Sequence, residues 1–280
     1  MMILGIPASE FAVLVVAILI AGALTGIFAG LLGIGGAAIS VPVMYEVFKA
    51  LGVADEVRMQ LCVGTALALI VPTSIRSYFA HRAKGAVDDR ILKIWALPII
   101  GGVLIGSFIA YFASAEVFKL LFVAFASLMA MKLLFGRESW RLGNELPGIG
   151  VTAAVGLVIG IISALMGIGG GAYSVLFLTL YGVSIHRAVA TSSGVGVLIS
   201  LPGVIGYMIA GWPQQALMPP LSVGYVSFLA VALFAPVSVL AAPYGARMAH
   251  SWPRRRLEVA FAIFLLVVAA RFFASLMGWF

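Results

Sequence analysis

Two similar stretches decide the fold of this chain. Residues 26–41 read GIFAGLLGIGGAAISV, and residues 160–175 read GIISALMGIGGGAYSV. Ten of the sixteen positions are identical, and the stretches lie 134 positions apart in a chain of 280 residues. Two halves that each carry an apolar helix interrupted by glycines are typical of membrane transporters built from repeats. We therefore predict a first repeat over residues 1–140 and a second over 141–280, forming one integral membrane domain.

The composition indicates a membrane protein. The chain is 63% hydrophobic and 10% charged, and its mean hydropathy is +1.18. Apolar runs recur from end to end, each close to the ~20 residues with which a helix crosses the hydrocarbon layer. The alternation of polar and apolar residues expected of a transmembrane barrel is absent from the sequence. We predict an all-α polytopic membrane protein with about eight to ten transmembrane or half-membrane helices.

Each half divides into five helical segments. The second segment of the first half is short, because a full span from Gly36 would carry Glu46, Lys49 and Asp55 through lipid. Each such charge costs at least ~2.5 kcal/mol at the bilayer centre. We therefore expect this segment and its counterpart to begin within the membrane. The predicted segments are 10–32, 36–50, 59–80, 91–113 and 116–136, then 147–167, 171–183, 188–211, 222–247 and 256–277.

The positions of Lys and Arg predict the orientation. Basic residues gather in the loop after 59–80, between the two halves and before 256–277, whereas 211–220 has none. Loops rich in Lys and Arg face the cytoplasm. The first half then starts outside and ends inside, and the second half does the reverse, so that both termini are external. Inverted repeats of this kind let one site face either side of the membrane in turn.

The glycine clusters predict a binding site. The clusters are GIGG at 33–36 and GIGGG at 167–171. They are too rich in glycine for a continuous helix, and broken backbone at membrane depth is tolerated only inside the protein or beside water. A break exposes the N–H groups and the positive dipole end of the next helix, which together attract an anion. The alternative is that the glycines only allow close helix packing. The predicted site residues are Gly35, Gly36, Gly169, Gly170 and Gly171, with Ser40 and Ser174 one turn further on.

The third segment of each half supplies hydroxyl groups. They can donate to an oxyanion, or they can simply hold helices together. Arg76 in the same segment either assists electrostatically or extends to the membrane surface. The hydroxyl residues that we assign to the site are Thr65 and Ser74 in the first half and Thr191, Ser192 and Ser193 in the second.

Other polar residues predict little chemistry. His81, Arg82 and Asp88 form a gate or a proton path in the loop after 59–80, or an ordinary solvated loop. Cys62 is expected to be a small core residue. We find no spacing of metal ligands and no catalytic constellation, so we expect neither an enzyme nor a cofactor. The net charge of +7 follows from membrane orientation rather than from nucleic-acid binding.

Several motifs resemble one family over nearly the whole chain. They are GLLGIGG at 30–36 with its copy after the middle, VGTAL at 63–67, PTSI at 72–75, AHRAKGAVD at 80–88 and VATSS at 189–193. Together they resemble the sulfite exporter TauE/SafE family, also called the toluene sulfonate uptake permeases. Ala37 departs from the pattern, because the family often has another glycine there.

This resemblance implies an inner-membrane permease of bacterial type. The family moves sulfite, thiosulfate and sulfonates such as sulfoacetate, and the driving force that the resemblance implies is an ion gradient, such as one of protons. We therefore predict a secondary transporter, acting as an exporter, that binds a small sulfur-containing anion between the helix N-termini of two inverted repeats. The alternatives are an anion channel on the same scaffold and a non-transporting membrane subunit. Membrane lipid is the other expected partner, and a homo-oligomer is left open.

Overall fold

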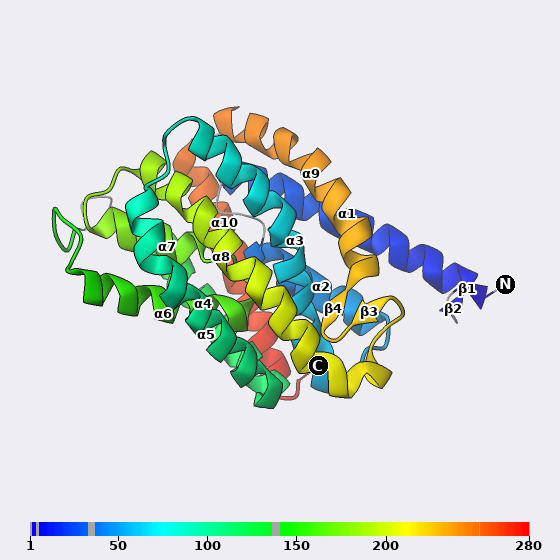
Figure 1. Cartoon of the computed structure of the whole chain (residues 1–280). Coiled ribbons are helices and arrows are strands. Elements are labelled where there is room, and N and C mark those ends of the chain that lie inside the picture. The colour runs from blue at the N-terminus through cyan, green and yellow to red at the C-terminus, as the bar shows by residue number, and fades with distance from the viewer. Residues whose placement is uncertain (1, 4–5, 33–36, 136–140, 252, 280) are drawn as a thin grey trace.

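The structure is a computed structural model that describes residues 2–3, 6–32, 37–135, 141–251 and 253–279 (Figure 1). The predicted turn residues Gly35 and Gly36 lie outside the described residues. The helices are α1 (Ala8–Leu32), α2 (Ala37–Ala50), α3 (Asp55–Ala83), α4 (Asp89–Phe112), α5 (Ala115–Phe135), α6 (Ile149–Met166), α7 (Gly171–Leu180), α8 (Ile185–Gly211), the short 3-10 helix η1 (Trp212–Leu217), α9 (Phe228–Ser251) and α10 (Arg254–Leu276).

Each of the ten predicted segments corresponds to one α-helix. The prediction was wrong at one boundary, because 222–227 is not helical. Strand β3 (Ser222–Val223) pairs antiparallel with β4 (Val226–Ser227), and the turn between them contains Gly224 at a φ of +53°. Strands β1 (Met2–Ile3) and β2 (Ile6–Pro7) form a second small hairpin at the N-terminus.

The lengths of the helices fit a membrane protein. Within the described parts of the chain, seven helices are long and apolar enough to cross a membrane. By contrast, α7 has 10 residues and α2 has 14. At 1.5 Å per residue α7 is about 15 Å long, half of a hydrocarbon layer about 30 Å thick. The chain is thus an all-α polytopic membrane protein with short second helices.

The long helices pack in pairs that join one half of the chain to the other. Helix α1 packs against α9, α4 against α6, α3 against α8, and α5 against α10 (Figure 1). If each helix is replaced by its counterpart in the other half, the pair of α1 and α9 becomes the pair of α6 and α4. The pairs α3 with α8 and α5 with α10 stay the same.

Glycines bring the first two pairs together at equivalent positions. Gly26 of α1 lies against the backbone of Ser238 in α9, and Gly160 of α6 lies against the backbone of Ile99 in α4. Gly26 and Gly160 are 134 positions apart, and Ile99 and Ser238 are 139 apart. Small residues allow such close approach between membrane helices. The same contact therefore occurs twice with the halves exchanged. One turn earlier, Gly22 lies against the backbone of Phe234, and Gly156 lies against the ring of Trp95.

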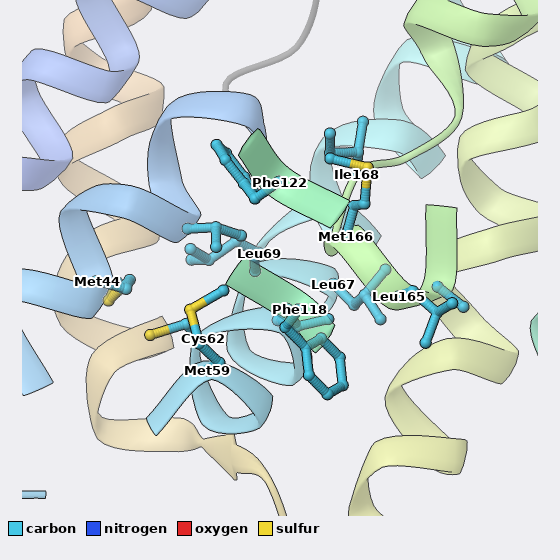
Figure 2. Close-up of a cluster of buried hydrophobic side chains, with 14 of the residues drawn as sticks. Met44, Met59, Cys62, Leu67, Leu69, Phe118, Phe122, Leu165, Met166 and Ile168 are labelled. Atoms are coloured by element: carbon cyan, nitrogen blue, oxygen red, sulfur yellow. The ribbon is translucent and has the colours of Figure 1, made fainter. Parts of the chain in front are cut away.

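The apolar core lies where the two halves meet. Cys62 is fully buried in it, as expected of a small core residue. Figure 2 shows part of this core, to which Met44 and Cys62 contribute from the first half and Met166 and Ile168 from the second. The segment that follows α6 is thus anchored by apolar side chains on both sides of Gly167.

Candidate functional site

The second glycine cluster forms a tight turn between α6 and α7. Gly167 ends α6 with a φ of +65°, and Gly170 precedes α7 with a φ of +68°. Both are left-handed conformations that glycine adopts without strain. The N–H groups of Gly167 and Ile168 donate to the carbonyl oxygen of Ser163, which closes α6. The helix is therefore interrupted at the glycine cluster, as the sequence predicted.

This turn lies between the two central helices. Gly167 packs against the backbone of Val63 in α3. A Cβ on Gly169 would lie 3.0 Å from Cγ2 of Ile70 in α3, and one on Gly170 would overlap Ile199 of α8. The glycine turn of the second half is thus enclosed by the third helix of each half.

The N-terminus of α7 is the part of this turn that suits an anion. Helix α7 begins at Gly171, directly after the buried Gly170, and no side chain of the described residues caps it. The first N–H groups of a helix have no partner within it and carry its positive dipole end. Ser174 is buried and its hydroxyl donates to the carbonyl oxygen of Gly170 at 2.8 Å. The backbone, rather than Ser174, therefore supplies the donors.

Ser74 is the predicted hydroxyl that the structure brings to this turn. Its Oγ lies against Gly196 of α8, where any Cβ would overlap it. A Cβ on Gly196 would also lie 3.6 Å from the carbonyl oxygen of Gly169. The crossing of α3 and α8 thus places one hydroxyl and two glycines beside the start of α7.

Two buried serines near this crossing were missed by the sequence analysis. Ser163 precedes Gly167 by one helical turn, and Ser200 follows Ile199 on α8. Each Oγ is buried without a hydrogen-bond partner among the described residues. Ser200 lies 126 positions after Ser74, as Thr191 lies 126 after Thr65. Aligning α3 with α8 at that offset would have identified Ser200.

Thr65 and Thr191 each have a structural partner. Both are fully buried. Oγ1 of Thr65 accepts a hydrogen bond from the N–H of Ser227 at 3.0 Å, and Oγ1 of Thr191 accepts one from the N–H of Asp88 at 3.0 Å. Ser227 directly precedes α9, and Asp88 directly precedes α4. Each threonine therefore fixes the start of the fourth helix in the other half.

The remaining predicted residues have less direct relations to the turn. Ser192 donates to the carbonyl oxygen of Val189 at 2.8 Å, and Ser193 to that of Ala190 at 2.6 Å, so both hydroxyls bond within α8. Arg76 is exposed on α3, and Ser40 is buried in α2.

The predicted gate residues surround the loop between α3 and α4. Asp88 caps α4, and its Oδ1 accepts from the N–H groups of Arg90 and Ile91 at 3.1 and 3.3 Å. Its Oδ2 lies 3.3 Å from a guanidinium nitrogen of Arg187 at the start of α8. Arg82 donates to the Tyr78 hydroxyl at 2.7 Å. His81 is half-buried in the last turn of α3.

Comparison with known proteins identifies the family. The model of the sulfite exporter TauE/SafE family matches residues 18–272. The chain belongs to this family. It is 33% identical over 259 residues to a probable membrane transporter protein of Haemophilus influenzae, covering 91% of this chain and 96% of the relative. It is 28% identical over 232 residues to one of Methanocaldococcus jannaschii, covering 82% and 84%. No solved structure matches it significantly.

The match confirms the family that the motifs predicted. Membership in a family of membrane transporters fits a protein without enzymatic activity. Within the described ranges, no group of three or more His, Cys, Asp or Glu side chains is placed to hold a metal ion.

Proposed function

We propose that the protein is a secondary transporter that exports a small sulfur-containing anion, such as sulfite or a sulfoacetate-like sulfonate, across the inner membrane. One observation carries the proposal: α7 begins directly after the buried Gly170, and within the described ranges no side chain caps its N–H groups. Such a helix end binds an oxyanion through backbone donors alone. The family description, sulfite exporter, supports the chemical class of that anion.

The mechanism that we propose is alternating access by two inverted repeats. The glycine contacts between α1 and α9 recur between α6 and α4 with the halves exchanged, which supports this symmetry. The N-terminus of α2 would be the counterpart of the α7 end. In this arrangement both termini are external, and an ion gradient, such as one of protons, drives the rocking of one repeat against the other.

Flux measurements in liposomes separate this proposal from its alternatives. Purified protein should give saturable efflux of labelled sulfite or sulfoacetate that responds to a proton or sodium gradient. It should also give counterflow, in which unlabelled anion inside drives transient uptake of label. A channel would show neither saturation nor counterflow. Absence of any sulfite or sulfonate flux would instead favour a non-transporting subunit.

A pair of serine variants tests the site. Ser74→Ala removes the hydroxyl beside the glycine turn, and should weaken anion binding about three- to tenfold, the value of one hydrogen bond. Ser193→Ala is the matched control, because the Ser193 hydroxyl already donates to its own helix at 2.6 Å. Equal effects of the two variants would contradict the placement of the site. Gly170 is unsuitable for such a test, since any side chain there is strained and overlaps Ile199.

A further inference from the structure

A second group of charged residues lies where α2, α3, α5 and α10 meet. Its centre is Lys119 of α5, whose side chain is 4% exposed. Lys119 Nζ lies 2.9 Å from Oδ2 of Asp55 and donates to the Ser275 hydroxyl at 3.2 Å. It also lies 5.5 Å from the ring centroid of Tyr45. This lysine is therefore enclosed by polar and aromatic partners from three other helices.

Arg58 is the second enclosed cation of the group. Its side chain is 11% exposed, and one guanidinium nitrogen lies 2.9 Å from Oδ1 of Asp55. Two further nitrogens donate to the carbonyl oxygen of Val53 at 3.0 and 2.6 Å. The Tyr45 hydroxyl also donates to Oδ1 of Asp55, at 2.9 Å. One carboxylate thus receives hydrogen bonds from three side chains.

The charges of this group do not balance. Arg58 and Lys119 carry two positive charges, and Asp55 carries one negative charge. The neighbouring pair of Glu46 and Arg271, 3.2 Å apart, is balanced by itself. Buried cations in membrane proteins are costly and mark functional sites by default. The excess positive charge favours an additional anion rather than a bound cation.

The exposure of the three charged side chains is uneven. The Asp55 side chain is 55% exposed, whereas both cations are nearly enclosed. The carboxylate thus covers the cations from the surface side. A carboxylate and a sulfonate present similar oxygens to Lys and Arg donors. Asp55 therefore has the position and the chemistry of a tethered anion.

We propose that Arg58, Lys119, Tyr45 and Ser275 form a second site for a small oxyanion, which Asp55 occupies in the present state and vacates when the anion enters. This inference rests on the proposed function for the nature of the anion. Along α3, Arg58 is 12 residues from Ile70 beside the glycine turn, or about 18 Å. The second site would lie near one end of the pathway, at the end of α3 opposite the Asp88 loop.

Counting bound anions tests the proposal. Isothermal titration of the purified protein uses methanesulfonate, which stays singly charged at neutral pH. Asp55→Asn should bind one more methanesulfonate per protein than wild type does. The affinity for the anion at this site should be about tenfold or more above that of wild type, because the competing carboxylate of Asp55 is removed. Glu56→Gln, the matched control, removes an exposed carboxylate on the same helical turn and should bind no additional anion. The double variant Asp55→Asn/Lys119→Gln should lose the gain.

The outcomes separate this site from the proposed function. An unchanged number of bound anions in Asp55→Asn, or a gain that persists without Lys119, would overturn the second site and leave a purely structural ion pair. A gain of one in Asp55→Asn without any binding to wild type would support the second site while removing support for the site at α7.

A labelling experiment in membranes gives an independent test. Asp55→Cys places a thiol between Arg58 and Lys119, and the native Cys62 is fully buried. A sulfonate-bearing methanethiosulfonate should react with this thiol faster, relative to its trimethylammonium analogue, than it does at Glu56→Cys. Methanesulfonate should slow the reaction at position 55 alone. Equal reagent preference at positions 55 and 56, or no protection by methanesulfonate, would refute the proposal.

Discussion

Helices α4 and α9 begin with the same backbone contact but with different chemistry. In both, the residue before the helix donates its N–H to the hydroxyl of a buried threonine in the other half, at 3.0 Å. Asp88 caps α4 with a carboxylate that also pairs with Arg187. Ser227 caps α9 with a neutral, buried hydroxyl that accepts from Ala230 at 3.3 Å. The repeat thus preserves the backbone contact, while charge is confined to one junction.

The largest expected effect comes from the glycine contacts that the two halves share. Gly26→Ala and Gly160→Ala each force a Cβ into the backbone of the facing helix, and each should lower the free energy of unfolding by about 3 kcal/mol. SDS titration of the purified variants measures this loss. Gly150→Ala in α6 is the control, because its Cβ meets open space and alanine favours the helix. A loss at only one of the two glycines would contradict the equivalence of the two contacts.

The two threonines should give a smaller and unequal pair of effects. Thr65→Val leaves the N–H of Ser227, which is 3% exposed, without its acceptor and should cost about 2 kcal/mol. Thr191→Val should cost less, because Asp88 is half-buried and water can replace the lost bond. The same SDS titration measures both. Equal losses would show that the Asp88 junction is as closed to water as the Ser227 junction.

The smallest effect is expected at the charged junction. The side chains of Arg187 and Asp88 are 59% and 21% exposed, so their ion pair should contribute below about 1 kcal/mol. A double-mutant cycle with Asp88→Asn and Arg187→Gln measures this coupling energy, which should fall further as salt screens the pair. A coupling near 3 kcal/mol that ignores salt would mean that the pair is enclosed and structural.

Hydropathy predicted every α-helix of the described residues, but not the short 3-10 helix η1, because the membrane sets the length of a spanning helix and excludes charge. The glycines also predicted the turn before α7, since only a left-handed backbone fits there. The prediction missed the β3–β4 hairpin because Val223 and Val226 extend the apolar run of the following helix, although Gly224 between them is a turn signal.

The roles of single polar residues depended on tertiary contacts. Thr65 and Ser74 both lie on α3, yet one anchors α9 and the other lies beside the glycine turn. Lys119 lies within the predicted segment 116–136, but its position against Asp55, 64 residues earlier, encloses it. The orientation of α3 relative to the other half decides these roles, and no local sequence pattern encodes it.

Locating the bound anion tests the central claim most directly. Anomalous scattering from crystals of the wild-type protein soaked in selenite, the selenium analogue of sulfite, would place the selenium atom. We predict a peak within hydrogen-bonding distance of the first N–H groups of α7, between Gly171 and Tyr173, and beside Ser74. Saturating selenite without a peak at this helix end would contradict the account.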